Sequence, residues 1–441
     1  MYRVSRRTLS VFILIAACVL GMGFYIIRYL VYGGTWVAAP FNSTVFSGGT
    51  LITGKVVDRN AVVLADVKDG VRIFAESQDI RRSTLHAVGD KEGNIGTGAL
   101  RVYAPQLIGY NPIGGAYSFS GSAGNTLTLT IDSRLHTAAL RALDGRRGVV
   151  MVSNYKTGEI VCMVSSPTFD PVSPPVYVDE EEGMYLNRAL QAAYVPGSTF
   201  KMITAAAAIE NITNIYNRTF ECTGEMRLSD DIVTCPSVHG SLGFEQGMRV
   251  SCNIVYGTLA LDMGAEVLSD YAAKFGLSGR TSVGGINTAS GNFTMAAEAS
   301  ADLAWSGVGQ YMNLVNPASM LRFVGAVAND GIAMDLFFLK RTGLSSIFPS
   351  SSQRLLSRDT AHELAAVIEV QNRANFPGLD IHAKSGTAQV GGNMAPHAWY
   401  VGYITNPGFP YAFVVIVENG GGGTANAAPI ANRVLQVAKE K

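Results

Sequence analysis

An uncharged, apolar run near the N-terminus constrains this chain more than any other feature of its sequence. The run extends from about Thr8 to Ile27, follows three arginines and is ended by Arg28. A helix rises 1.5 Å per residue, so a run of this length spans a hydrocarbon core of about 30 Å. The sequence therefore predicts one transmembrane helix over residues 9–31, preceded by a short tail at residues 1–8.

The same arginines predict the orientation of this helix. They lie before the run, whereas the segment from Tyr29 to Gly54 contains no Lys or Arg. Because positive residues mark the cytoplasmic end of a membrane helix, residues 1–8 are expected in the cytoplasm and everything after the helix outside it. The alternative is a cleaved secretory signal, but the small-residue site Val37-Ala38-Ala39 is followed by Pro40, which hinders cleavage.

Composition indicates a folded chain that does not bind nucleic acid. Hydrophobic residues make up 48% of the 441 residues and charged residues only 15%, enough for one large core and a smaller second domain. Thirty-four basic residues balance thirty-four acidic ones. A neutral chain has no overall field that attracts nucleic acid.

The five cysteines give no recognisable metal motif. Cys18 lies inside the membrane run, and none of the six histidines, His239 included, belongs to a zinc or triad pattern. We therefore expect no metal, and we expect Cys252 to be a small core residue. Cys222 and Cys235 flank a polar loop, and outside the cytoplasm they can form a disulfide or remain free thiols. The sequence leaves both alternatives open.

Two domains are expected beyond the membrane run. Lys55 to Ala65 predicts a β-hairpin, because two valine-containing runs flank the turn residues Asp58-Arg59-Asn60. The remainder of residues 50–125 is rich in glycine and has no long helical period. We expect a small, mostly β, non-catalytic module there, followed by a larger domain over residues 126–441.

The larger domain is predicted to have an α/β (α+β) fold. Strands are expected near both of its ends and helices in its middle, with strands at 127–131, 148–152, 159–164, 383–390, 398–404 and 411–418 and helices at 133–143, 200–210, 255–263, 295–303, 317–328 and 428–439. Early and late strands pair to bury their apolar residues. The expected result is a mainly antiparallel sheet covered by helices.

Ser198 and Lys201 are the first candidates for catalysis. They lie in Pro196-Gly197-Ser198-Thr199-Phe200-Lys201, which leads into an apolar helix, so we expect both side chains on one face of its first turn. A serine needs a nearby base, and a desolvated lysine can accept its proton. The helix N-terminus also offers N–H groups to an oxyanion. The same spacing at Ser153 and Lys156 falls in a predicted turn and is assigned to chance.

A second candidate motif is Ser251-Cys252-Asn253, which comes just before another apolar helix. Its hydroxyl can relay a proton, and its amide can hold a substrate amide. A rival with the same pattern, Ser290-Gly291-Asn292, lies in polar, loop-like surroundings. We therefore prefer Ser251 and Asn253.

The third motif, Lys384-Ser385-Gly386-Thr387, lies on a predicted strand. A strand beside a cleft can present Lys384, Ser385 and Thr387 to a carboxylate, while Gly386 lets a substrate backbone approach closely. The literal Lys156-Thr157-Gly158 lies in a hairpin turn, where backbone geometry alone explains the glycine.

In this order the three motifs resemble the set found in penicillin-binding proteins and related β-lactamases. Further segments are similar to the same family: Leu127–Asp132, Lys156–Ile160, Ser165–Pro167, Asn187–Ala189, Gly309-Gln310 and Asn329–Gly331. Gly54 to Ala65 is similar to the start of the non-catalytic module of class B members. In these proteins the module precedes a transpeptidase domain, which is their only catalytic domain. The chain is therefore identified as a class B penicillin-binding protein.

The resemblance implies a membrane-anchored serine D,D-transpeptidase that cross-links peptidoglycan stem peptides through an acyl-enzyme. Ser198 would attack the carbonyl between the two terminal D-alanines, and an amine from a neighbouring strand would complete the cross-link. The backbone N–H groups of Ser198 and Thr387 would form the oxyanion hole. The other implied roles are proton acceptor for Lys201, proton relay for Ser251, amide contact for Asn253, and carboxylate contacts for Lys384 and Thr387.

The ligands implied are stem peptides with a D-Ala-D-Ala donor and an amine acceptor, and β-lactams, which mimic that donor. No cofactor is implied. A polytopic glycan polymerase in the membrane is a partner by family analogy alone. The alternatives are a D,D-carboxypeptidase or a β-lactamase with the same residues, and a catalytically silent scaffold or β-lactam sensor. The sequence leaves the acceptor amine and the role in elongation, division or sporulation open.

Overall fold

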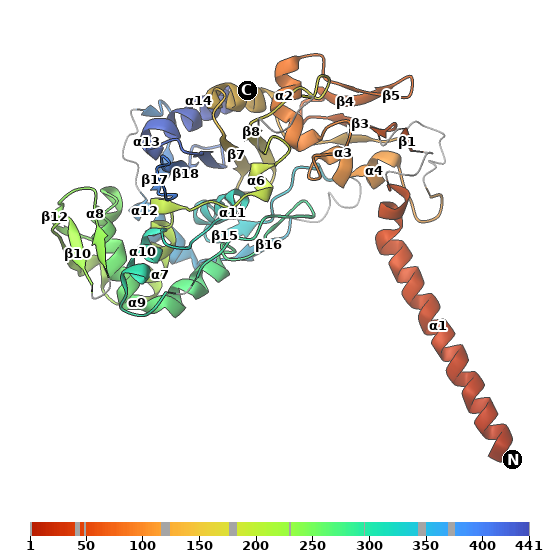
Figure 1. Ribbon diagram of the computed structural model, residues 1–441, viewed down its shortest axis with the longest axis horizontal. Helices are drawn as coiled ribbons and strands as arrows, with labels where there is room; N and C mark the ends of the chain where they lie inside the picture. Colours follow the sequence, from red (N-terminus) through yellow and green to blue (C-terminus); the bar gives the residue numbers. More distant parts are fainter. Residues whose placement is uncertain are drawn as a thin grey trace.

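The computed structural model describes residues 2–39, 45–47, 50–115, 124–175, 183–228, 231–294, 296–342, 350–368 and 375–440. Helix α1 (Tyr2–Val37) is continuous and projects away from the rest of the chain (Figure 1). Its stretch Ser5–Val37 is apolar and long enough to cross a membrane, and an apolar window of 18 residues within it is not buried inside the protein. The predicted span lies within it, and this single N-terminal helix suggests a single-pass anchor. Between the predicted helix and the module, residues 40–44 and 48–49 lie outside the described residues.

The N-terminal module is built on a four-stranded sheet in the order β5-β4-β3-β6. Its strands are β3 (Lys55–Val57), β4 (Val63–Lys68), β5 (Val71–Phe74) and β6 (Thr126–Thr128). The predicted hairpin is present as the antiparallel pair β3–β4. We expected β6 to open the larger domain, but it runs parallel to β3 with Leu127 opposite the buried Val56. Pairing there buries both side chains, so β6 completes the sheet of the module.

The module also contains helices that its sequence pattern did not reveal. They are α2 (Gln78–Val88), α3 (Ala99–Val102) and α4 (Ala104–Ile108), beside the short pair β1 (Phe46–Ser47) and β2 (Thr50–Leu51). The buried face of α2 includes Ser83, Thr84 and His86, so its apolar period is weak. The expectation of a mostly β module was therefore wrong, since helices and strands both contribute to it.

A five-stranded antiparallel sheet forms the centre of the larger domain, in the order β17-β18-β19-β7-β8. Its strands are β7 (Gly148–Asn154), β8 (Ile160–Ser166), β17 (Ile381–Ala388), β18 (His397–Ile404) and β19 (Tyr411–Val417). The predicted pairing of early and late strands is confirmed, because β19 lies beside β7. Strand β17 forms one edge of this sheet.

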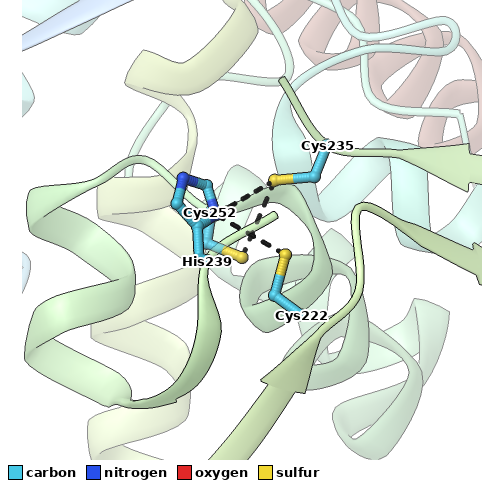
Figure 2. Close-up of side chains that lie close together, drawn as sticks. All are labelled: Cys222, Cys235, His239 and Cys252. Carbon is cyan, nitrogen blue, oxygen red and sulfur yellow. Dashed lines mark hydrogen bonds between the residues drawn. The ribbon is translucent and has the colours of Figure 1, made fainter. Parts of the chain in front are cut away.

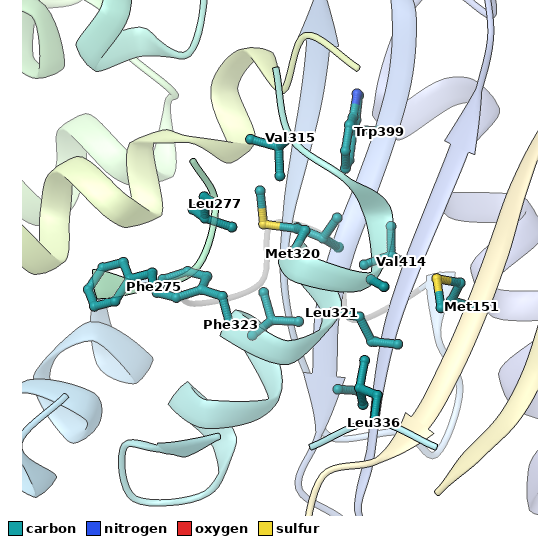
Figure 3. Close-up of a cluster of buried hydrophobic side chains, with 14 of the residues drawn as sticks. Met151, Phe275, Leu277, Val315, Met320, Leu321, Phe323, Leu336, Trp399 and Val414 are labelled. Carbon is teal, nitrogen blue, oxygen red and sulfur yellow. The ribbon is translucent and has the colours of Figure 1, made fainter. Parts of the chain in front are cut away.

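Helices cover both faces of this sheet (Figure 1). Along β19, Val414 and Ile416 pack in the core on the side of α11 (Pro317–Ala328), whereas Phe413 and Val415 pack on the side of α5 (Ser133–Leu143) and α14 (Ala428–Lys439). Figure 3 shows Met320, Leu321 and Phe323 of α11 against the first of these faces. Burial on both sides explains why the strands are continuously apolar.

A helical region with small strand pairs lies beside the β17 edge (Figure 1). Its helices are α7 (Lys201–Asn211), α8 (Phe244–Arg249), α9 (Asn253–Lys274), α10 (Ala301–Val308) and α12 (Arg358–Val367), and its small strands include β9 (Thr219–Cys222), β10 (Glu225–Arg227), β11 (Ile232–Thr234) and β12 (Gly240–Gly243). Helix α10 was expected from Met295, which lies outside the described residues. It begins later because the Ser300 side chain caps it by accepting a hydrogen bond from Leu303 N at 3.1 Å.

Asp58 joins the module to the larger domain. Its buried carboxylate accepts hydrogen bonds from the backbone N–H groups of Asn60 and Val62 in its own turn, at 2.8 and 2.9 Å. It also accepts from Ser133 N at 3.1 Å and Ser133 Oγ at 2.8 Å, at the start of α5. One carboxylate thus holds the hairpin turn against a helix N-terminus.

Candidate active site

Ser198 lies in a tight turn between the sheet and α7. The turn is a 3₁₀ helix, Gly197–Thr199, directly before α7, rather than the first turn of α7 as predicted. Gly197 has a φ of +54°, and a Cβ there would lie 2.8 Å from the carbonyl oxygen of Thr387 on β17. The turn is therefore pressed against the edge strand, and Ser198 is half-buried at the wall of a cleft.

Lys201 is the first residue of α7 and is fully buried. Its Nζ donates hydrogen bonds to Asn253 Oδ1 at 2.7 Å, to the carbonyl oxygen of Ser251 at 2.5 Å and to Ser251 Oγ at 3.2 Å. These contacts join the first predicted motif to the second.

Lys384 approaches Ser251 from β17. Its Nζ donates to Ser251 Oγ at 3.0 Å and to the carbonyl oxygen of Ser385 at 2.8 Å. All three motifs therefore meet at one hydroxyl group.

Burial changes the proton affinity of both lysines. Loss of solvation lowers the pKa of Lys201 well below its ordinary 10.5, and the nearby charge of Lys384 lowers it further. Loss of solvation also lowers the pKa of Lys384 to about 7. A neutral amine is therefore accessible near neutral pH, and a neutral amine can act as a base.

The backbone around Ser251 is shaped for these contacts. Ser251 has a φ of +55°, a conformation that non-glycine residues rarely adopt. Asn253, the first residue of α9, donates from Nδ2 to the carbonyl oxygen of Thr234 at 2.8 Å. This second contact fixes the amide so that its oxygen faces Lys201.

The cleft in front of these residues has a volume of about 600 Å³. It is lined by predicted site residues and by several that the sequence analysis did not single out: Ser198, Thr234, Cys235, Pro236, Val250, Ser251, Asn253, Trp305, Val308, Gln310, Tyr311, Ser385, Thr387 and Gln389. Tyr311 has a φ of +60°, which is unusual for an aromatic residue. The Gly309-Gln310 segment before it was noted only for its family resemblance, and no motif pointed to Trp305 or Tyr311.

Gly386 does not line the cleft with Ser385 and Thr387. A Cβ at Gly386 would lie 2.9 Å from the carbonyl oxygen of Pro196 and 2.9 Å from Thr199 Cγ2. The predicted role of Gly386 in admitting a substrate backbone stays a prediction. The glycine lets β17 pack closely against the turn that carries Ser198.

The three competing motifs lie in other surroundings. Ser153 is buried in β7, and Lys156 Nζ is bonded to Asn329 Oδ1 at 2.9 Å in the β7–β8 turn. Ser290 Oγ donates to the neighbouring carbonyl of Gly291, and Asn292 Nδ2 donates to Thr294 and Met312. Among the described residues, none of these side chains is hydrogen-bonded to Lys201, Ser251 or Lys384.

The cysteines give a result that the sequence analysis did not expect. Both thiols of the possible disulfide, Cys222 and Cys235, are free. Together with Cys252 and His239 they form a compact cluster of potential metal ligands. The spacing of these residues in the sequence did not reveal the cluster, and the expectation that the protein binds no metal stays a prediction.

Comparison with known proteins agrees with the family resemblance of the three motifs. Residues 148–436 match the family described as the penicillin binding protein transpeptidase domain. The peptidoglycan D,D-transpeptidase PbpA of Mycolicibacterium smegmatis is 28% identical over 71% of this chain and 72% of its own length. The peptidoglycan D,D-transpeptidase MrdA of Escherichia coli is 27% identical over 69% of this chain and 56% of its own length.

Solved structures share the fold. Penicillin-binding protein A from M. tuberculosis, as a penicillin G acyl-enzyme complex, has a TM-score of 0.75 at 24% identity and covers 88% of this chain and 99% of its own. The D,D-transpeptidase domain of a peptidoglycan glycosyltransferase from Eggerthella lenta has a TM-score of 0.73 at 25% identity, over 88% and 98% of the two chains. A complex between PBP2 and MreC from Helicobacter pylori has a TM-score of 0.63 at 21% identity, over 71% and 64%.

The family match covers the five-stranded sheet, the helical region beside it and all three motifs that meet at Ser251. Its description agrees with the resemblance on which those motifs were first selected. The chain therefore belongs to the penicillin-binding protein transpeptidase family, in its class B.

Proposed function

We propose that this protein is a peptidoglycan D,D-transpeptidase in which Ser198 is the nucleophile. The observation that carries the proposal is the convergence of Lys201, Asn253 and Lys384 on Ser251, at the wall of the cleft that Ser198 lines. The relatives named as peptidoglycan D,D-transpeptidases give the substrate class.

In the first half-reaction Ser198 Oγ attacks the carbonyl between the two terminal D-alanines of a stem peptide. Lys201, whose pKa is lowered by burial, accepts the hydroxyl proton. The developing oxyanion is held by the backbone N–H groups of Ser198 and Thr387. The amide bond breaks, a proton passes to the leaving D-alanine through Ser251, and an ester to Ser198 remains.

In the second half-reaction an amine from a neighbouring strand attacks this ester. A new amide forms, the ester bond breaks, and the proton lost by the amine returns to Ser198. Asn253 orients the acyl amide, and Lys384 with Ser385 and Thr387 holds the terminal carboxylate of the donor. Because β17 is an edge strand, an extended stem peptide can pair with its free backbone groups.

The arrangement in the membrane follows from the arginines at the N-terminus. We propose that residues 1–8 lie in the cytoplasm and that both folded domains lie outside it, in reach of the cell wall. The domain limits at 50–125 and 126–441 are proposed with one adjustment, since β6 belongs to the module. A polytopic glycan polymerase is a proposed partner, by analogy with membrane-bound wall synthesis enzymes.

Acylation by a fluorescent penicillin tests the nucleophile. The full chain in detergent is expected to become stably labelled, and Ser198→Ala is expected to lose all label. Ser153→Ala, in the competing motif, is the matched control and should label like wild type. Rapid release of hydrolysed drug would instead indicate a β-lactamase, and absence of any label would indicate a scaffold.

Transfer to an amine distinguishes the remaining alternative. Incubation with a synthetic stem peptide and a D-amino acid acceptor should give the exchanged product by mass spectrometry. Hydrolysis of the terminal D-alanine without exchange would indicate a D,D-carboxypeptidase.

A further inference from the structure

Four metal-ligating side chains from four separate segments converge beside the cleft (Figure 2). Cys222 ends β9, Cys235 follows β11, His239 precedes β12, and Cys252 precedes α9. Their three sulfur atoms and one ring nitrogen all lie within 4.8 Å of one another. Each points toward a common centre.

Three of the distances between these atoms match the edges of a tetrahedron around one ion. His239 Nδ1 lies 3.5 Å from Cys222 Sγ and 3.5 Å from Cys235 Sγ, and Cys235 Sγ lies 3.8 Å from Cys252 Sγ. A tetrahedral zinc with bonds of about 2.3 Å to sulfur and about 2.0 Å to nitrogen separates two sulfurs by about 3.8 Å, and sulfur from nitrogen by about 3.5 Å. These three separations agree with a tetrahedral ion, and the other separations in the cluster are at most 4.8 Å.

We propose that Cys222, Cys235, His239 and Cys252 bind a structural zinc ion. Three thiolates and one imidazole are a soft ligand set in the geometry that zinc prefers. The four protein ligands fill the tetrahedron, so no position is left for water or substrate. The ion therefore stabilises the fold instead of taking part in the acyl transfer.

A disulfide accounts for this arrangement less well. Any one bond would leave a third thiol and the imidazole without a function in the same cluster. The cluster belongs to the part of the chain proposed to lie outside the cytoplasm, where free thiols are oxidised. A zinc ion uses all four ligands and protects the three thiolates.

The proposed ion lies next to the residues that hold Lys201. Cys252 separates Ser251 from Asn253 in the sequence, and Asn253 N donates to Cys235 Sγ at 3.3 Å. Asn253 Nδ2 donates to Thr234 O, one residue before Cys235. Zinc would therefore fix the segments carrying β9, β11 and β12 to the start of α9. The same connection holds Ser251 and Asn253, so the four zinc ligands act as positioning residues for the active site. This positioning role rests on the proposed function.

Metal analysis of the purified full chain tests the site directly. Elemental analysis is expected to find about one zinc per chain in wild type, and much less than one in Cys222→Ala. Cys162→Ala is the matched control, because Cys162 is equally buried but lies in the core on the other face of the sheet. Full zinc content in Cys222→Ala, or no zinc in wild type together with a Cys222–Cys235 disulfide by mass spectrometry, would overturn the proposal.

Cobalt substitution tests the site in the wild-type protein, so the result does not depend on whether a cysteine variant folds. Wild type stripped of metal by a chelator and titrated with Co²⁺ should develop the strong visible bands of a tetrahedral cobalt site and a sulfur-to-cobalt charge-transfer band, saturating at one equivalent. Zinc should bleach both. A weak, octahedral-type spectrum would contradict the ligand set.

Acylation of the same samples tests the connection to Ser251 and Asn253. Removal of the metal is expected to slow labelling by penicillin by about 10²-fold, since small displacements of catalytic groups have effects of that size. Added zinc should restore the rate in wild type but not in Cys222→Ala. Zinc binding without any effect on acylation would refute the positioning role alone, and zinc binding by a chain that never acylates would refute only the proposed function.

Discussion

Lys201 and Lys384 donate hydrogen bonds to the same atom, Ser251 Oγ, at 3.2 and 3.0 Å. One lysine comes from the helix that follows Ser198 and the other from the edge strand of the sheet. Two ammonium groups this close would repel each other, and burial already lowers the pKa of each. In the proposed mechanism this shared hydroxyl is the bridge over which a proton passes between the two amines.

Replacing this bridge should slow acylation while leaving the fold intact. Ser251→Ala is expected to reduce the second-order rate of penicillin labelling by about 10²- to 10⁴-fold, the range of general acid–base contributions. Labelling reactions that are quenched at successive times and analysed on gels give the rate. Ser290→Ala in the competing motif serves as the control, and an unchanged rate in Ser251→Ala would contradict the relay.

The pH dependence of acylation should be bell-shaped, with its alkaline limb near pH 7. On the acid side the rate falls as Lys201 becomes protonated and can no longer accept a proton. On the alkaline side the acylation rate falls above about pH 7, where Lys384 of the enzyme without substrate loses the positive charge that attracts a carboxylate. Second-order acylation rates between pH 5 and pH 10 would reveal both limbs.

The alkaline limb can be tested separately. Lys384→Arg keeps a positive charge at all these pH values, so the variant should lose the decline above neutrality even if its overall rate is lower. A decline that persists unchanged in Lys384→Arg would assign that limb to another group.

Asp58 should be important for stability and unimportant for chemistry. Asp58→Ala removes the acceptor of four hydrogen bonds, two of which come from Ser133 at the start of α5. A loss of about 2–4 kcal/mol in the free energy of unfolding is expected. Denaturant unfolding measures it, with Glu92→Ala on an exposed part of the same module as control. Equal stability of the two variants would contradict this role for Asp58.

Acid should destabilise the protein partly through His136. Burial lowers the pKa of His136 from 6.5 to about 4. Its Nε2 accepts from Met163 N at 3.2 Å and its Nδ1 donates to Asp132 O at 3.0 Å, which requires the neutral ring. The unfolded chain binds the proton first, so stability is lost as the pH falls from about 6.5 toward 4.

Unfolding temperatures across this pH range, compared between wild type and His136→Phe, measure that loss. The phenylalanine variant is expected to be less stable at pH 7 but to show a shallower decline toward pH 4. Parallel curves for the two proteins would rule out His136 as a source of the acid sensitivity.

Much of the larger domain was predictable because its elements carry strong local signals. Helices α11 and α14 were predicted at their observed limits, Pro317–Ala328 and Ala428–Lys439, from regular apolar periods. Helix α10 was shifted because its cap at Ser300 was not recognised. Helix α2 was missed because its buried face includes serine, threonine and histidine.

The candidate site was predictable in its members but not in its contacts. The three motifs could be selected by type, order and resemblance, yet nothing in the sequence indicates that both lysines share Ser251 Oγ. The cysteine cluster was missed for a related reason. Its ligands are spaced widely along the chain, with twelve residues between Cys222 and Cys235 and twelve between His239 and Cys252, unlike the close pairs of familiar zinc motifs. Only the folded chain brings them together.

Helix α1 has a consequence for where cross-links can be made. Its 36 residues correspond to about 54 Å of helix at 1.5 Å per residue, whereas a hydrocarbon core is only about 30 Å thick. Directly after Arg28, which ends the apolar run, Tyr29 Oη donates to the carbonyl oxygen of Pro112 in the module at 2.8 Å. An anchor that leaves the bilayer as rigid helix and docks at once onto the folded part acts as a stalk of fixed length. The working height of the enzyme above the lipid is then set by its architecture, and the wall layer it can reach is correspondingly narrow.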